Sequence, residues 1–255
     1  MSPVDVPFRI DGPADGPVLV LSNSIGSTSG MWDPQVPALA EHFRVVRYET
    51  RGHAGAPVPH GPYSIADLGG DVVALLDRLG AERAHFVRLS LGGMTGMWLG
   101  VNAADRIDRL TLMCTSAMLA RDVDWFARAA LVREQGTGAI AQATVERWFT
   151  SGFIASEPDV AARWRATISD TPAEGYAGCA EAIGSMDLEE DIARISAPTL
   201  VISGRQDPAT PPPHGELIAS RIPGARMEIV EAAHLANYER PEEVTRLLLS
   251  HLEAR

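Results

Sequence analysis

The stretch Phe86-Val87-Arg88-Leu89-Ser90-Leu91-Gly92-Gly93 decides the fold of this chain. An apolar run ends at Ser90, and the glycine pair that follows opens a helical pattern. A strand that turns sharply into a helix leaves the residue at the turn accessible, which is the arrangement called a nucleophile elbow. The motif G-x-S-x-G begins with glycine, where this chain has Arg88. The stretch therefore predicts Ser90 as a nucleophile on an imperfect elbow.

Strands and helices alternate on both sides of this elbow. Apolar runs predict strands at 18–23, 43–49, 84–89, 109–114, 198–204 and 225–230. Helical spacing of apolar residues predicts helices at 34–41, 65–79, 92–103 and 214–221 and from 241 onward. The alternation predicts an α/β fold with a mostly parallel central sheet flanked by helices. Ligands of such sheets bind at the carboxyl ends of the strands.

The predicted helix at 65–79 carries signals at both ends. Ser64 precedes it and Asp67 follows three residues later, a variant of the capping box. Gly80 comes directly after its last apolar residue, where a glycine commonly ends a helix.

The alternation lapses between residues 120 and 188. This region is helical in pattern without a clear strand, and it holds Trp125, Trp148 and Trp164. We expect an inserted helical cap at 120–188 over the active edge of the sheet. Residues 1–119 and 189–255 would then form one α/β core.

Composition limits the classes of partner. The 255 residues carry a formal net charge of −11, and all 22 basic residues are arginine. An acidic chain without a basic stripe is a poor binder of nucleic acid or anionic membranes. We therefore expect a small-molecule substrate and a cytoplasmic protein, since there is no secretory signal pattern and no apolar run of about 18 residues.

Cys114 lies in an apolar run, which predicts a buried free thiol. No feature of the sequence indicates the oligomeric state.

Three residues at predicted strand ends form a possible catalytic triad. Ser90 is followed in the chain by Asp207 and then by His234, each directly after an apolar strand. This is the order Ser, Asp, His of the α/β-hydrolase arrangement, in which the acid orients the histidine and the histidine activates the serine. Taken singly, each residue has an ordinary explanation as a helix cap, a turn aspartate or a loop histidine. Their shared order and context favour the triad.

An oxyanion hole requires two N–H donors beside the nucleophile. The residue after the nucleophile, Leu91, is expected to supply one backbone N–H at the start of a helix. The loop after the 18–23 strand is expected to supply the other, from Ile25. An ordinary turn is the alternative interpretation of that loop.

Motifs along nearly the whole chain are similar to those of the 3-oxoadipate enol-lactonase family of α/β-hydrolases. The similar stretches are 23–26 with 31–33, 47–53, 61–65, 90–94, 146–150, 207–212 and 232–235. The resemblance implies hydrolysis of an enol-lactone to 3-oxoadipate in aromatic catabolism, with no cofactor and no metal.

The substrate of that family carries a carboxylate, which an acidic protein must bind locally. Arg133 in the predicted cap is the candidate, because guanidinium binds carboxylate in bidentate fashion. A solvated arginine on a helix surface is the alternative. Trp148 is a candidate for lining the pocket, and a core tryptophan is the alternative there.

Three positions depart from the family pattern. Arg88 replaces glycine at the elbow, Glu49 stands where aspartate is expected, and Ala54 stands where glycine is expected. A long charged side chain at position 88 should either crowd the elbow or find a paired environment. One hypothesis gives Arg88 a carboxylate partner, and another gives the site an altered substrate or weak activity. A related esterase and a non-catalytic binding protein on the same fold are the competing functions.

Overall fold

The computed structural model describes residues 1–119 and 123–254, and a seven-stranded sheet forms its centre. The strand order is β1-β3-β2-β4-β5-β6-β7, in which β1 is antiparallel to β3 and the other pairs are parallel. The strands are β1 Phe8–Asp11, β2 Val18–Ser22, β3 Arg44–Tyr48, β4 Ala84–Leu89, β5 Ile107–Met113, β6 Thr199–Gly204 and β7 Arg226–Val230. The predicted mostly parallel sheet is confirmed.

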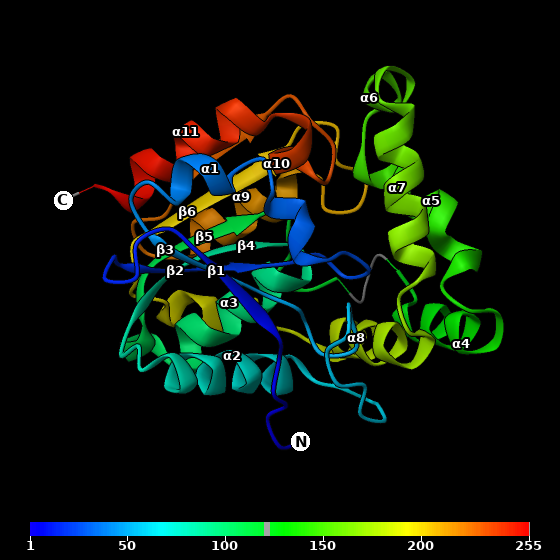
Figure 1. Cartoon of the computed structure of the whole chain (residues 1–255), viewed down its shortest axis with the longest axis horizontal. Coiled ribbons are helices and arrows are strands. Elements are labelled where there is room, and N and C mark those ends of the chain that lie inside the picture. Colours follow the sequence, from blue (N-terminus) through cyan, green and yellow to red (C-terminus); the bar gives the residue numbers. More distant parts are fainter. Residues whose placement is uncertain (120–122, 255) are drawn as a thin grey trace.

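Helices cover both faces of this sheet. In Figure 1, α1 and α11 lie above the sheet and α2 and α3 lie below it. These core helices, with two others near the C-terminus, are α1 Val36–Leu39, α2 Ile65–Leu79, α3 Leu91–Asn102, α9 Pro212–Arg221, α10 Ala236–Glu239 and α11 Pro241–Leu252. Because both faces are covered, central strands such as β4 are almost wholly buried, which explains their continuous apolar runs.

The predicted caps of α2 are confirmed. The Ser64 hydroxyl accepts the Asp67 N–H at 3.2 Å, and the Asp67 carboxylate accepts the Ser64 N–H at 2.9 Å, so the capping box is reciprocal. Gly80 follows the helix with φ of +63°, a left-handed conformation that glycine adopts without strain.

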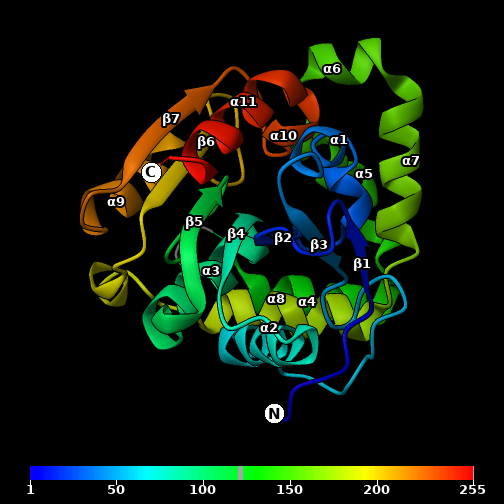
Figure 2. The same cartoon turned by 60° about the vertical axis from the view of Figure 1, so that its left-hand side comes forward.

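Only helices occur among the described residues between β5 and β6. They are α4 Trp125–Gln135, α5 Gly138–Trp148, α6 Ser151–Ser156, α7 Pro158–Ser169 and α8 Ala173–Ser185, followed by the short 3₁₀ helix η3 Asp191–Arg194. Helices α4–α8 gather on one side of the molecule, opposite the C-terminus (Figure 1), and α5–α7 run along one flank when the view is turned (Figure 2). The predicted start of the cap at residue 120 lies outside the described residues.

Two smaller predictions have clear outcomes. The helix predicted at 34–41 is reduced to α1, and a 3₁₀ helix, η1 Ser29–Trp32, precedes it. Cys114 is a buried free thiol, as predicted, and Cys179 is another.

In the described part of the chain, no helix has both the length and the apolar character needed to cross a membrane.

Candidate active site

Ser90 occupies a strained turn between β4 and α3. Its backbone has φ of +57° and ψ of −117°, a conformation that residues other than glycine rarely adopt. Neighbouring groups hold the turn: the Ser90 N–H donates to the Met113 carbonyl at 3.0 Å, and the Thr115 hydroxyl donates to the Ser90 carbonyl at 2.8 Å. The turn therefore has the geometry of a nucleophile elbow.

The glycine pair after Ser90 permits close packing. A Cβ on Gly92 would lie 2.7 Å from the carbonyl oxygen of Ser22 in β2. A Cβ on Gly93 would lie 2.6 Å from the side chain of Thr115, just after β5. Any larger residue would push the start of α3 away from the sheet, so both glycines are required here.

Arg88 is fully buried and has no carboxylate partner among the described residues. Its guanidinium carbon lies 4.3 Å from the centroid of the Phe86 ring, and Nη1 lies 3.5 Å from the Tyr48 hydroxyl. Nε and Nη2 have no hydrogen-bond partner within the described residues. Burial therefore lowers the pKa of Arg88. For the described residues the hypothesis of an ion pair is wrong, because the guanidinium contacts the Phe86 ring of β4 and the Tyr48 hydroxyl of β3 instead.

A glycine in the next helix makes room for this arginine. A Cβ on Gly96 would lie only 2.5 Å from Arg88 Cδ, so the arginine stem occupies space that a larger residue in α3 would fill. Ser90 keeps its place at the turn, and the crowding that the sequence predicts is avoided. Arg88 does not line the cavity described below.

Asp207 and His234 form a hydrogen-bonded pair. His234 Nδ1 lies 2.8 Å from Asp207 Oδ2, and both side chains are almost completely buried. Thr210 also donates to Asp207, through its hydroxyl at 2.7 Å and its N–H at 3.1 Å. Burial alone would raise the pKa of Asp207, but the His234 interaction and the Thr210 hydrogen bonds hold it below the usual value. Asp207 is thus an ionised acceptor that orients the histidine.

The loop after β2 is held by a second histidine. The Gly26 N–H donates to His53 Nε2 at 2.9 Å, and His53 Nδ1 lies 3.1 Å from the Arg51 carbonyl. These two contacts define a neutral ring that is protonated on Nδ1. Burial lowers the pKa of His53 to about 4, which keeps the ring neutral. Ile25, the predicted oxyanion donor, immediately precedes Gly26 in this loop.

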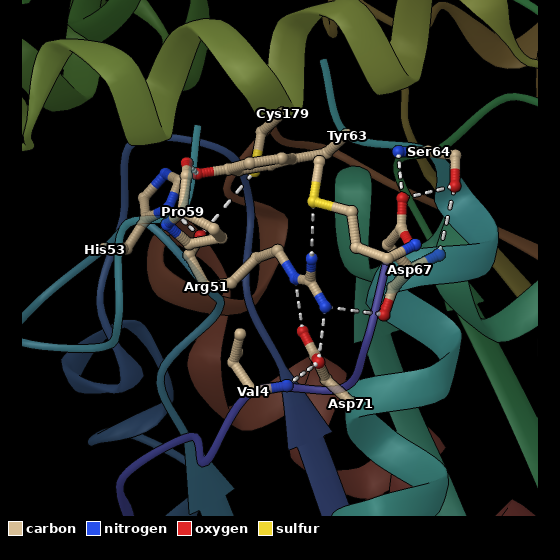
Figure 3. Close-up of polar contacts among 10 residues, drawn as sticks. Val4, Arg51, His53, Pro59, Tyr63, Ser64, Asp67, Asp71 and Cys179 are labelled. Atoms are coloured by element: carbon tan, nitrogen blue, oxygen red, sulfur yellow. Dashed lines mark hydrogen bonds and ion pairs between the residues drawn. The ribbon is translucent and has the colours of Figure 1, made fainter. Parts of the chain in front are cut away.

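Arg51 anchors His53 to the core (Figure 3). Its guanidinium bonds both carboxylate oxygens of Asp71 at 2.6 Å and lies 5.4 Å from the centroid of the Tyr63 ring. Helix α8 passes over this cluster, and the Cys179 thiol contacts the Arg51 carbonyl at 3.8 Å. The segment that includes Arg51 and His53 is therefore fixed by buried contacts to α2 and α8.

A cavity of about 270 Å³ lies between the strand ends and helices α4, α5 and α8. Among the predicted site residues, Ser90, His234, Ile25 and Trp148 line it. Asp207 lies behind His234, and Leu91 begins α3 directly after Ser90. Thr210 and His214 also line the cavity, and neither was predicted from the sequence. Within the described residues, no cluster of side chains is suited to hold a metal ion.

Among the described residues, two arginines line this cavity, and Arg133 is not one of them. Arg128 on α4 donates to the Tyr176 hydroxyl at 2.8 Å and to the Thr144 hydroxyl at 2.9 Å. Arg147 on α5 also lines the cavity, and burial together with the charge of Arg128 lowers its pKa. The described residues that line the cavity include no aspartate or glutamate. Arg128 and Arg147 therefore give the described part of the wall a positive charge.

Arg133 pairs instead with two glutamates of α8. It bonds Glu174 at 2.8 Å and Glu181 at 2.5 Å, and about a third of its side chain is exposed. Arg133 lowers the pKa of Glu174 to about 2. The structure thus does not bring Arg133 to the cavity. The sequence held a signal for an arginine that does line the cavity: Arg147 is the neighbour of Trp148 and stands within the family-like stretch 146–150.

The remaining departures from the family pattern are accommodated locally. The Glu49 carboxylate accepts the Ser29 N–H at 3.0 Å and the Ser29 hydroxyl at 2.5 Å, and burial raises its pKa. Ala54 has φ of +44° in an exposed turn, a left-handed conformation that suits glycine better.

Residues 17–241 match the family model of the alpha/beta hydrolase fold. The chain belongs to this family and is an enzyme of the ester-bond hydrolase class. It is 41% identical over 231 residues to 3-oxoadipate enol-lactonase 2 of Acinetobacter baylyi, covering 91% of this chain and 86% of that one. The family resemblance predicted from the motifs is confirmed.

Two solved structures of hydrolases are also similar to this chain. The enol-lactonase from Burkholderia xenovorans LB400 superposes with a TM-score of 0.96 at 42% identity, covering 98% of this chain and 97% of that one. A hydrolase from Pseudomonas aeruginosa PA01 superposes with a TM-score of 0.94 at 46% identity, covering 98% and 94% of the two chains.

Proposed function

We propose that this protein hydrolyses 3-oxoadipate enol-lactone through a Ser90–His234–Asp207 triad. One observation carries the proposal: the strained serine and the Asp-paired histidine line a single cavity whose wall also holds two arginines. A nucleophile, a base and an anion-binding wall are the parts needed for a lactone that bears a carboxylate. The similarity to enol-lactonases supports the choice of substrate.

The reaction begins at His234. Its Nδ1–H donates to Asp207, so Nε2 is the atom available to accept the Ser90 proton. The Ser90 oxygen attacks the lactone carbonyl, and the N–H groups of Leu91 and Ile25 stabilise the negative oxygen that forms. Collapse of this intermediate breaks the bond to the ring oxygen, which takes the proton from His234 as it leaves as an enol. The product of this step is an acyl-enzyme on Ser90.

A water molecule completes the cycle. His234 takes its proton as the water attacks the acyl carbonyl, and the same N–H groups stabilise the second tetrahedral intermediate. The proton on His234 then returns to Ser90 as the acyl bond breaks, which releases a carboxylic acid that loses its proton to solvent. The enol isomerises to the ketone, so the product is 3-oxoadipate, a dicarboxylate.

Arg147, together with Arg128, is the proposed anchor for the substrate carboxylate. Both side chains line the cavity that contains Ser90, whereas the guanidinium of Arg133 is bonded to Glu174 and Glu181. We further propose that residues 120–188 act as the cap that presents these arginines to the strand ends.

The test is hydrolysis of authentic enol-lactone by the wild type and by Ser90→Ala. We expect Ser90→Ala to lower kcat by about four orders of magnitude or more, because the nucleophile is lost. Ser220→Ala, on the exposed side of α9, is the matched control and should keep full activity. Equal activity of Ser90→Ala and the wild type, with both folded, would refute the proposal.

A further inference from the structure

Glu239, at the end of α10, links the segment around His234 to helices α5 and α6. Its carboxylate accepts the Ala233 N–H at 3.1 Å and the Thr150 N–H at 3.3 Å, and it also accepts the Thr150 hydroxyl. Ala233 immediately precedes His234, and Thr150 lies in the connection between α5 and α6. The Glu239 carboxylate therefore joins the segment around His234 to Thr150, which is 89 residues away from Glu239 in the chain.

A second contact joins the same segments on the other side of the histidine. The Leu235 N–H donates to the Trp148 carbonyl at 2.9 Å. The residues before and after His234 are thus both tied to residues 148–150. Aromatic packing reinforces the junction, since the rings of Phe149 and Tyr238 lie 6.1 Å apart. His234 is held by the α5–α6 connection as well as by Asp207.

The other side of this connection faces the cavity. Arg147 and Trp148 line the cavity, whereas Glu239 and Thr150 do not. The backbone that carries the proposed carboxylate anchor is therefore the backbone that holds the catalytic histidine. A substrate carboxylate bound at Arg147 would fix the position of this backbone directly.

We propose that Glu239 is a positioning residue, which transmits the seating of an anionic substrate at Arg147 to the orientation of His234. The inference rests on the proposed function. Binding energy from a remote charged group would then be used to align the base, an effect that appears in kcat rather than KM. A neutral substrate makes no contact with Arg147 through a carboxylate, so its turnover depends less on the link.

Glu239 also has a plain structural role, which the test must separate from positioning. Thr150 is the N-cap of α6, where its hydroxyl accepts the Phe153 N–H at 3.2 Å. Loss of the Glu239 contacts could therefore lower the melting temperature without affecting substrate preference. The ratio of kcat for an anionic ester to kcat for a neutral ester is the quantity that a purely structural role would leave unchanged.

The experiment compares p-nitrophenyl glutarate with p-nitrophenyl pentanoate on wild type, Glu239→Gln and Thr150→Val. We expect kcat for the anionic ester to fall about tenfold in both variants, with kcat for the neutral ester changed less than about twofold and KM values near wild type. The double variant should show no further loss, because both changes break the same link. Thr150→Ser keeps the hydroxyl and should restore wild-type preference.

Glu231→Gln is the matched control, since this carboxylate lies in the same segment but pairs with Arg205. It should leave both esters unaffected. An equal fall in kcat for both esters, or no change in either, overturns the positioning role. If Glu239→Gln does not fold, Thr150→Val alone decides the matter. Wild type that hydrolyses neither these esters nor the enol-lactone overturns the proposed function, and the inference with it.

Discussion

His53 Nε2 accepts the N–H of Gly26 at 2.9 Å, and this bond joins the loop after β3 to the loop that carries Ile25. The acceptor nitrogen must be unprotonated, and burial lowers the pKa of His53 to about 4. Protonation would place a hydrogen on the atom that accepts from Gly26. The proposed oxyanion donor thus depends on a histidine that is remote from the triad in sequence.

Stability is therefore predicted to fall between pH 6.5 and 4. In the unfolded chain His53 binds a proton near pH 6.5, but in the folded chain it does so only near pH 4, so acid favours unfolding in this window. The expected loss from His53 is about 3 kcal/mol of unfolding free energy. Urea titrations at several pH values measure it, and His53→Gln should flatten the slope.

His251 supplies the control for this prediction. Burial also lowers the pKa of His251 to about 4, but its ring contacts the Leu110 carbonyl, and neither residue lines the cavity. His251→Gln should likewise flatten the pH dependence of stability while keeping wild-type kcat. A double variant His53→Gln, His251→Gln with the same slope as the wild type would contradict the assignment, whereas a smaller slope is expected from His85, whose pKa is also lowered by burial.

Substitution of Arg147 should weaken binding of anionic substrates selectively. Arg147→Gln removes a charge from the cavity wall, and a hydrogen bond to a charged group contributes about 1.5–3 kcal/mol. We expect KM for the enol-lactone to rise about tenfold or more, with KM for p-nitrophenyl pentanoate nearly unchanged. Arg133→Gln is the control, because Arg133 is bonded to Glu174 and Glu181 outside the cavity. A larger KM effect from Arg133→Gln would restore Arg133 as the anchor.

The contrast between Arg133 and Arg147 shows which part of the site could not be predicted from the sequence. The shared location of Ser90, Asp207 and His234 was predictable because each of them follows a strand, and parallel strand ends meet at one edge of the sheet. Arginines on helices without neighbouring strands have no such constraint. Which of Arg128, Arg133 and Arg147 faces the cavity depends on how α4, α5 and α8 pack together, which is a tertiary property.

Arg88 was unpredictable for a related reason. Its neighbours are Phe86 on its own strand, Tyr48 on β3 and Gly96 on α3, and only the folded sheet and helix bring the last two to it. The cost of burying a charge suggests a carboxylate partner, but none of the described residues places one beside Arg88. The local motif predicted the turn at Ser90, and the long-range packing determined how the arginine is accommodated.

Replacing Arg88 with an apolar residue should not destabilise the protein. Its guanidinium is buried without a counter-charge among the described residues, so Arg88→Met removes a desolvation penalty. We expect an unfolding free energy equal to wild type or higher by about 1–4 kcal/mol in urea titrations. Turnover should also be retained, since Arg88 does not line the cavity.

Arg51 is also buried, but unlike Arg88 it is paired with a carboxylate, that of Asp71. Arg51→Met leaves the buried Asp71 carboxylate without its partner and should lower the unfolding free energy by about 3–5 kcal/mol. The two substitutions are chemically identical, so their difference isolates the effect of pairing. A comparable loss in Arg88→Met would show that the Tyr48 and Phe86 contacts stabilise the charge after all.

Ala54 offers a stabilising change at one residue. Its φ of +44° costs an alanine about 1 kcal/mol or more, and glycine adopts this conformation freely. Part of the gain is offset by the greater freedom of glycine in the unfolded chain, so Ala54→Gly should raise the unfolding free energy by up to about 1 kcal/mol. Gly55 is the matched control, because it has φ of +80° and open space around its Cα. Gly55→Ala should lower stability by about the same amount, and a loss of stability in Ala54→Gly would show that the alanine is not strained.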